Sequence, residues 1–403
     1  MKLKIISPFI LMGALAGLSA CGESTQSQAG PEFGLTADFT EQELIQHLVD
    51  KVLRPTHQSV DDNIQLMQTH LAPYCETITE TRSDDAAFAN VKSAYQTLMF
   101  SWQNLEAMQM QPLLANDAEL RNQIYSWPDS VSACGVELDL AFFTQGMVNG
   151  QPYELANRAN SRRGLDALET LLFNEKIGSI CAIDNTVLTQ WRQLSQAEQD
   201  TTRCEFAQVV LDDLKNSFQT FKERWYQGDN NYRQTLVEGD PREAINQLGQ
   251  ALFYAEFLKD NKLGVPLGYF SNQCGNAPCP AEVESPNAKL AIKNMQANLQ
   301  GLELFFTGGD DTEEHKAPGF DDYLQAVGDK QTASTMLLAL SNASESLTKI
   351  EQDMAEVLNQ QGSAFTELQS VHNAIKTLTD QLKTHFITSL SVDLPDTSAG
   401  DND

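Results

Sequence analysis

Two acidic side chains, Asp166 and Glu169, lie three residues apart in an apolar stretch that predicts a helix. Positions i and i+3 of a helix share a face, so both carboxylates can point toward one spot. Carboxylate oxygens suit Ca²⁺, Mg²⁺, Mn²⁺ or iron. Two buried carboxylates without a cation would repel each other, and one would stay protonated. The pair predicts a metal or ligand site; the alternative is a salt-bridge cluster in which Arg162 or Arg163 supplies the counter-charge.

Other side chains that could take part in chemistry favour binding over hydrolysis. A zinc hydrolase needs about three protein ligands, usually histidines, and a base that activates water. The histidines are His47, His57, His70, His315, His372 and His385. None belongs to an HExxH motif, and no GxSxG elbow occurs, so we assign no catalytic residue. Trp102 and Trp127 are large aromatics that either line a cleft near the carboxylate pair or fill a helical core.

The charge balance excludes one class of partner. The 403 residues include 55 Asp and Glu against 27 Lys and Arg, for a formal net charge of −28. Binding to nucleic acid needs a clustered excess of Lys and Arg, which this chain lacks. The apolar content of 41% is that of a globular protein. We therefore expect a folded acidic protein that binds no nucleic acid.

The N-terminus predicts export and lipid anchoring. Residues 1–20 combine Lys2 and Lys4 with an apolar segment too short to span a bilayer, as in a signal peptide. The sequence Leu18-Ser19-Ala20-Cys21 resembles the bacterial lipobox, in which the cysteine becomes the lipidated first residue. Residues 21–37 read as a flexible tether. We expect a protein of the cell envelope, held by the acyl chains of Cys21 in the outer membrane and facing the periplasm.

The other cysteines predict disulfides. Six remain, an even number in an oxidising compartment, and their wide spacing without a CxxC motif argues against a metal site. The simplest of the possible connectivities joins them in sequence order, as Cys75–Cys134, Cys181–Cys204 and Cys274–Cys279.

Hydrophobic periodicity predicts helices almost throughout. Capping boxes occur at Thr40–Glu43 and Ser195–Glu198, and apolar stripes spaced three and four residues apart follow them. Longer helices are expected over about 84–114 and 330–360. Strand signals are nearly absent. We expect an all-α protein of two packed four-helix-bundle-like halves, 38–235 and 236–390, followed by an acidic tail, 391–403.

Several segments resemble the imelysin-like family, whose signature motif is GxHxxE. The resemblance covers about residues 40–385. It rests on segments that occur in the family's order: Ser101-Trp102-Gln103-Asn104-Leu105-Glu106, Ile124-Tyr125-Ser126-Trp127-Pro128, Gly164-Leu165-Asp166-Ala167-Leu168-Glu169, Lys262-Leu263-Gly264-Val265-Pro266-Leu267-Gly268 and Glu284-Ser285-Pro286. The family's histidine position is Asp166 here, which leaves an all-oxygen pair.

The resemblance implies a two-bundle envelope protein linked to iron uptake, and some family members carry a peptidase label. We expect a binding component that captures or hands over iron or another divalent cation and works with an iron-uptake partner protein. Its cleft between the bundles would contain Asp166 and Glu169, with Arg163, Trp102 and Trp127 nearby. The alternatives are a metallopeptidase and a structural or protein-interaction lipoprotein without a small ligand.

Overall fold

The computed structural model describes residues 38–78, 86–128, 131–183, 185–309 and 317–395. The signal segment, Cys21, the tether and the tail beyond residue 395 lie outside this part. Helices make up nearly all of its regular structure, and the all-α class is confirmed. A short antiparallel hairpin of β1 (Met147–Val148) and β2 (Gln151–Pro152) is the exception. No helix among the described residues has the length and apolar character needed to cross a membrane.

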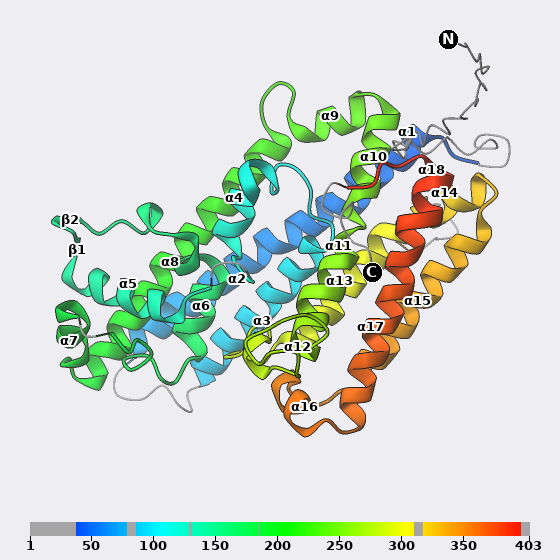
Figure 1. The fold of residues 1–403 in the computed structure, drawn as a ribbon. Helices are drawn as coiled ribbons and strands as arrows, with labels where there is room; N and C mark the ends of the chain where they lie inside the picture. The colour runs from blue at the N-terminus through cyan, green and yellow to red at the C-terminus, as the bar shows by residue number, and fades with distance from the viewer. Residues whose placement is uncertain (1–37, 79–85, 129–130, 184, 310–316, 396–403) are drawn as a thin grey trace, which may run out of the picture.

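The elements up to residue 238 come first along the chain (Figure 1). They are α1 (Glu41–His47), the π-helical turn η1 (Leu48–Leu53), α2 (Arg54–Thr77), α3 (Ala86–Glu106), α4 (Ala115–Ile124), α5 (Ala133–Gln145), the short 3₁₀ turns η2 (Leu155–Asn157) and η3 (Asn160–Arg162), α6 (Gly164–Phe173), α7 (Thr186–Arg192), α8 (Gln196–Tyr226) and α9 (Tyr232–Glu238).

The remaining elements complete the molecule. They are α10 (Pro241–Ala251), α11 (Tyr254–Phe257), the π-helical turn η4 (Leu258–Gly264), α12 (Val265–Leu267), the 3₁₀ turn η5 (Pro280–Glu282), α13 (Ala291–Thr307), α14 (Phe320–Ala326), α15 (Lys330–Thr348), α16 (Met354–Gln360), α17 (Ser363–Gln381), the π-helical turn η6 (Leu382–Phe386) and α18 (Ile387–Leu390).

Local sequence explains where several helices begin. The Thr40 hydroxyl accepts a hydrogen bond from the Glu43 N–H, while the Glu43 carboxylate accepts one from the Thr40 N–H. Ser195 and Glu198 form the same reciprocal pair at the start of α8. Both predicted capping boxes are therefore confirmed, and each satisfies N–H groups that have no partner within the helix.

Two predicted helices are shorter than expected. The helix expected over 84–114 ends at Glu106, and turns lead into Pro112, which has no N–H to donate and disfavours helical geometry in the residue before it. The helix expected over 330–360 divides into α15 and α16. At the end of α15 the N–H groups of Lys349 and Ile350 bond to carbonyls three residues back, and this tightened turn ends the helix.

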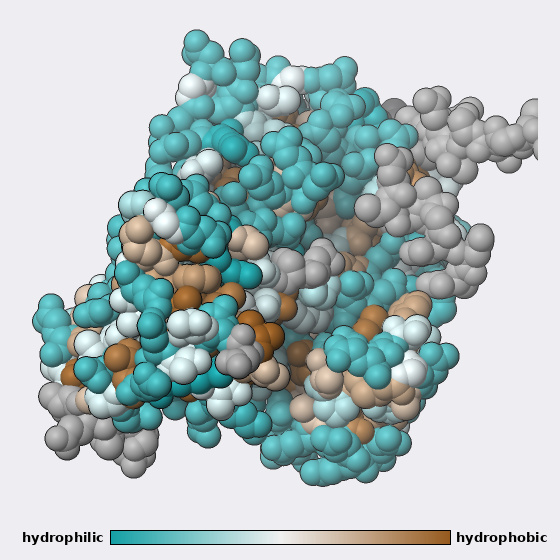
Figure 2. All heavy atoms as spheres, turned by 60° about the vertical axis from the view of Figure 1, so that its left-hand side comes forward, coloured by the Kyte–Doolittle hydropathy of each residue, from teal (hydrophilic) through white to brown (hydrophobic). Residues whose placement is uncertain are grey.

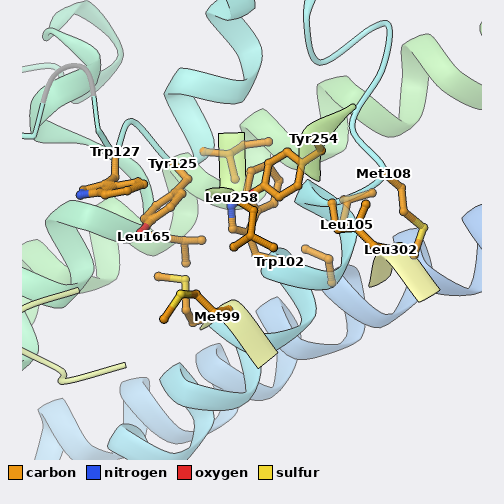
Figure 3. Packing of buried hydrophobic residues seen from close by; sticks show 14 of the residues in the cluster. Met99, Trp102, Leu105, Met108, Tyr125, Trp127, Leu165, Tyr254, Leu258 and Leu302 are labelled. Carbon is orange, nitrogen blue, oxygen red and sulfur yellow. The ribbon is translucent and has the colours of Figure 1, made fainter. Parts of the chain in front are cut away.

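Helix α3 lies at the centre of the fold. It packs against α2 on one side and α13 on another, while α13 in turn contacts α15 and α15 pairs with α17 (Figure 1). Gly301 permits the close approach of α13 to α3, because a Cβ there would lie 2.5 Å from the carbonyl oxygen of Asn104. Buried apolar side chains from α3, α6, α11 and α13 meet in one core, part of which is drawn in Figure 3. The division of the chain at residue 235 stays a prediction.

Three disulfides connect the six cysteines, and two of the predicted pairings are wrong. The bonds are Cys75–Cys204, Cys134–Cys181 and Cys274–Cys279, so only the last follows sequence order. Packing decides the other two. Helix α2 lies against α8, which brings Cys75 to Cys204 across 129 residues of sequence, and the segment after α6 returns to the start of α5.

One face of the molecule is predominantly hydrophilic. Figure 2 shows one face on which hydrophilic residues predominate and hydrophobic residues form smaller patches between them. This agrees with a net charge of −28 carried mainly on the outside of helical layers. A few acidic groups lie inside, among them Asp166 and Glu169.

Candidate functional site

The predicted carboxylate pair lies inside the protein. Asp166 and Glu169 are 5% and 4% exposed, and both occur in the first two turns of α6. Neither forms an ion pair with any described residue. The salt-bridge interpretation of the pair is therefore not what the structure shows.

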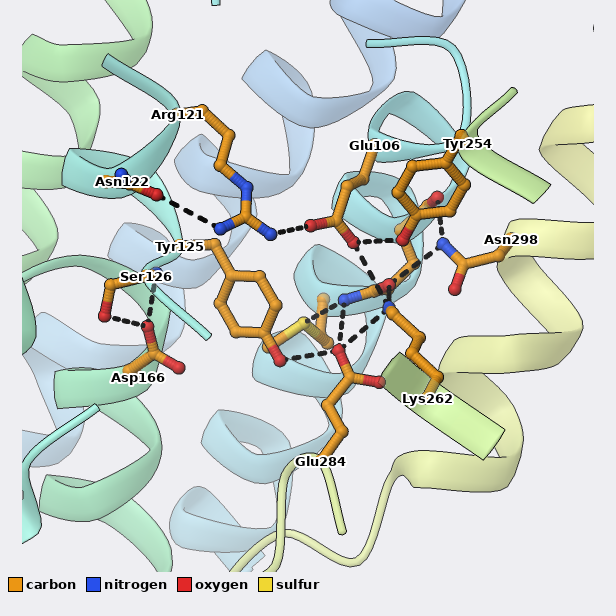
Figure 4. A network of polar contacts seen from close by, with 12 residues as sticks. Glu106, Arg121, Asn122, Tyr125, Ser126, Asp166, Tyr254, Lys262, Glu284 and Asn298 are labelled. Carbon is orange, nitrogen blue, oxygen red and sulfur yellow. Dashed lines mark hydrogen bonds and ion pairs between the residues drawn. The ribbon is translucent and has the colours of Figure 1, made fainter. Parts of the chain in front are cut away.

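Gly164 sets the position of Asp166. Its φ of +65° lies in the left-handed region, and a Cβ on it would come within 2.3 Å of the carbonyl oxygen of Ile124. Glycine therefore lets the start of α6 lie directly against the segment that follows α4. As a result Asp166 Oδ2 accepts two hydrogen bonds from Ser126, one from its N–H at 2.6 Å and one from its Oγ at 2.9 Å (Figure 4).

Glu169 is held by a different part of the chain. Its Oε1 accepts hydrogen bonds from the consecutive N–H groups of Asn287 at 2.8 Å and Ala288 at 3.0 Å. Consecutive backbone N–H groups that converge on one anion form a nest. This nest belongs to residues 284–288, here named the 284–288 turn, which lies between η5 and α13.

Burial controls the protonation of both carboxyl groups. Removal from water raises the pKa of Asp166 to about 6, although the Ser126 donors lower it. Burial likewise raises the pKa of Glu169 to about 7, against the lowering effect of the Ala288 and Asn287 N–H groups, and the negative charge of Asp166 raises it further. Neutral donors thus compensate only part of the desolvation.

A second set of charged groups lies beside the pair. Lys262 Nζ donates to Glu284 Oε1 at 2.9 Å, to Glu106 Oε2 at 3.2 Å and to Gln103 Oε1 (Figure 4). Arg121 donates to Glu106 Oε1 at 2.5 Å. The π-helical turn η4, an irregularity often found at functional sites, brings Lys262 into this position, where the residue is 2% exposed.

Tyrosine hydroxyls complete this network. Tyr125 donates to Glu284 Oε1 at 2.7 Å and Tyr254 donates to Glu106 Oε2 at 2.8 Å. Burial raises the pKa of both hydroxyls well above its usual range, so they remain proton donors. The second oxygen of Glu284, Oε2, is buried without a hydrogen-bond partner among the described residues.

The buried groups carry unequal charge. The acidic members are Asp166, Glu169, Glu106 and Glu284, and the basic members are Arg121 and Lys262. If all were ionised, the centre would hold an excess of two negative charges. Buried charge without compensation is expensive, so the centre must either take up protons or accept a cation.

The structure places the other predicted site residues as follows. Arg163 does not neutralise Asp166. Its guanidinium group forms a bidentate ion pair with the Asp213 carboxylate. Arg162 pairs with Asp139. Trp102 lies completely inside the core (Figure 3). Trp127 is 9% exposed and packs edge-on against Phe257, and the centroid of its ring lies 5.7 Å from Lys262 Nζ.

Sequence reasoning did not assign Glu106, Lys262 or Glu284 to the site. The sequence did contain an indication of their role, because each of these charged residues lies in a segment that resembles the family. The structure shows that all three are buried. Their meeting could not be inferred, since Glu106 and Lys262 are 156 residues apart.

A surface hollow lies elsewhere than expected. It has a volume of about 520 Å³ and is lined by Asn104, Gln300, Glu303, Leu304, Thr307, Gly309, Ala317, Asp321 and Asp322. Asp166 and Glu169 do not line it. The buried carboxylate pair therefore does not lie in this hollow.

The donor set does not form a closed metal centre. No group of three or more His, Cys, Asp or Glu side chains in the described part of the chain is arranged to hold a metal ion. Asp166 Oδ1 and Glu284 Oε2 are carboxylate oxygens left without hydrogen-bond partners there. Such oxygens fit a hard divalent cation that keeps some ligands of its own, and they do not fit a zinc site, which needs three or four protein ligands, usually histidine or cysteine.

Neutralising Glu169 should change how stability depends on pH. The folded protein retains the Glu169 proton up to about pH 7, whereas a typical glutamate loses it near 4.5. This difference favours folding below pH 4.5, and the benefit is lost as the pH rises to about 7. As the pH rises from 4.5 to 7, the unfolding free energy of Glu169→Gln should therefore increase by about 3 kcal/mol relative to that of wild type.

Denaturant unfolding of both proteins across this pH range measures the effect. The buried His57, whose pKa burial lowers to about 3, acts with the opposite sign but is common to both proteins and cancels. The exposed Glu345→Gln serves as the matched control, because it makes the same substitution at a carboxylate on the surface. A constant difference for Glu169→Gln would show that the carboxyl group is not desolvated as described.

Comparisons with known proteins agree with this fold. Residues 53–385 match the family model described as Imelysin. An imelysin-like protein from Psychrobacter arcticum superposes with a TM-score of 0.60 at 16% identity, covering 89% of this chain and 99% of that one. An iron-regulated protein A precursor from Parabacteroides distasonis has a TM-score of 0.64 at 16% identity, covering 89% and 98%. No curated protein matches the sequence. Because the family match spans most of the chain, the protein belongs to the imelysin family.

Proposed function

We propose that this imelysin-family protein is a binding component for metal acquisition that captures or hands over a divalent cation, with iron as the primary cargo. The observation that carries this proposal is the buried excess of two negative charges around Asp166, Glu169 and Glu284. A dication would compensate that excess and replace the protons that the pair otherwise holds. The structural neighbour named as an iron-regulated protein supports iron as the cargo.

The place of action is part of the same proposal. The lipobox around Cys21 would anchor the protein in the outer membrane, with the helical part in the periplasm. Three disulfides support an oxidising compartment. An iron-uptake protein is the partner we propose for handover.

We do not propose peptidase activity. None of the histidines that the structure describes joins the buried network, whose one serine hydroxyl, that of Ser126, donates to Asp166 with no histidine between them. Both oxygens of Glu106 are bonded to basic groups, Oε1 to Arg121 and Oε2 to Lys262, so this carboxylate is not free to activate water.

Metal titration of the full chain tests the proposal. We expect stoichiometric binding of Mn²⁺ or Fe²⁺ to wild type, measured by calorimetry and elemental analysis. Asp166→Asn with Glu169→Gln should weaken binding about tenfold or more, because these substitutions remove charge but keep side-chain size. The control is Glu345→Gln, an exposed acidic residue. Equal, near-zero metal in wild type and variant would exclude the metal-binding role.

A further inference from the structure

Helices α15 and α17 form a layer at one side of the molecule. They pack against each other, and behind them α15 contacts α13 while α17 contacts α11 and η4 (Figure 1). The exposed residues of 331–344 and 363–377 carry no charge, and the half-buried Glu367 and Lys376 lie at the edges. These exposed residues are here named the α15–α17 face: Gln331, Ser334, Leu338, Ser341, Asn342, Ser363, Thr366, Ser370, Asn373 and Thr377.

An uncharged face of two helices stands out in this chain, in which 20% of residues are charged and the net charge is −28. Like charges that meet across an interface repel each other, so two copies of the chain approach most easily where carboxylates are absent. A basic partner would instead be attracted to the acidic parts of the surface. The charge distribution therefore favours a second copy of this chain as the occupant of the face.

The hydroxyl groups of the face already have hydrogen-bond partners within their own helices. They donate to backbone carbonyls three or four residues earlier: Ser334 to Gln331 at 3.0 Å, Ser370 to Thr366 at 3.0 Å and Thr377 to Asn373 at 3.1 Å. Covering such hydroxyls leaves no donor unsatisfied. Leu338, 61% exposed, is the most exposed large apolar side chain of the described residues, and burying it favours association.

We propose that the α15–α17 face binds a second copy of this chain in an antiparallel, twofold-symmetric dimer centred on Leu338. In such a dimer every contact occurs twice. Ser334, four residues before Leu338, then lies opposite Asn342 of the second copy, four residues after it. A hydroxyl group thus faces an amide, and no carboxylate faces another across the centre of the interface. This inference does not depend on the proposed metal-binding role.

The size of the face sets the strength of the dimer. Each of the two helices has 19 residues and is therefore about 28 Å long. Two such helices side by side, about 18 Å wide, present about 500 Å² per copy, which is less than the roughly 800 Å² of a standard interface. We therefore expect a reversible dimer with a Kd on the order of 10⁻⁵ M.

Sedimentation velocity of the full chain over a range of concentrations tests for this dimer. The dimer should become tighter as the salt concentration rises from about 0.05 to about 0.5 M, because salt screens the repulsion between two acidic copies. Leu338→Asp should weaken it about tenfold or more, since two carboxylates would meet at the twofold axis. The control is Leu66→Asp, which changes an exposed leucine of α2 and should alter the Kd about twofold or less.

A pair of opposite charges tests the antiparallel register through a gain of affinity. Ser334→Lys combined with Asn342→Glu leaves the net charge unchanged and places an ammonium opposite a carboxylate at two symmetric positions. This double variant should form a dimer about fivefold tighter than that of either single variant. The two positions are eight residues apart along α15, too far to pair within one helix.

Three results would contradict the proposal. A chain that remains monomeric at about 0.1 mM would overturn the dimer. A dimer that Leu338→Asp leaves intact would show that the copies meet elsewhere, and the α15–α17 face would lose its role. A double variant that dimerises more weakly than both single variants would overturn the antiparallel register, because like charges would then lie opposite each other.

Discussion

Replacing Lys262 with methionine should lower the free energy of unfolding by about 4 kcal/mol. The ammonium group lies between Glu106 and Glu284 and is almost fully buried. Methionine has a similar size but no charge, so both carboxylates would lose a partner in a region that already has excess negative charge. Removing one member of a buried ion pair leaves the other uncompensated, and that cost exceeds the value of most single contacts.

Chemical denaturation of wild type and Lys262→Met measures this loss. The double variant Lys262→Met with Glu284→Gln removes the opposing charge and should recover about half of the loss. Lys289→Met serves as the surface control, because its side chain is exposed and its ion pair with Glu356 is solvated. A loss below about 1 kcal/mol in Lys262→Met would mean that water or protons already compensate the network.

The Cys75–Cys204 disulfide should stabilise the fold more than the Cys274–Cys279 disulfide. Their sequence separations are 129 and 5 residues. A cross-link restricts the unfolded chain more when it closes a longer loop, by about 5 kcal/mol for the first bond and about 2 kcal/mol for the second. The double alanine variant at residues 75 and 204 should therefore be the less stable one.

Denaturant unfolding of the two double alanine variants under the same conditions tests the order. Metal binding supplies a second comparison, because the Cys274–Cys279 loop precedes the 284–288 turn whereas Cys75 and Cys204 join α2 to α8. We expect the double alanine variant at residues 274 and 279 to lose more Mn²⁺ affinity than the variant at residues 75 and 204, although it loses less stability. Reversal of the stability order would show that native-state strain, not loop closure, dominates.

Helical structure was predictable because its determinants are local. A capping box needs residues three apart, as at Thr40–Glu43, and an apolar stripe needs spacings of three and four. The same rule placed Asp166 and Glu169 in adjacent turns of one helix, and both are buried there. The family resemblance then pointed to the segments that meet at this helix.

Pairing between distant segments was not predictable from such rules. Sequence order gave the wrong partners for Cys75, and proximity along the chain gave the wrong partner for Arg163, which binds Asp213. Both outcomes depend on α8, which packs against α2 and α6. Spacing along the chain contains no information about which helices pack together.

The sequence by itself determined an acidic, all-α chain with two carboxylates on adjacent turns of one helix. Only the tertiary structure decided that these carboxylates have no basic partner, because it brings Lys262 and Arg121 to Glu106 and Glu284 instead. The physical reason is that helix periodicity fixes which face a side chain occupies, whereas the groups that this face meets come from other segments, 40 residues away for Ser126 at Asp166 and 118 residues away for Asn287 at Glu169.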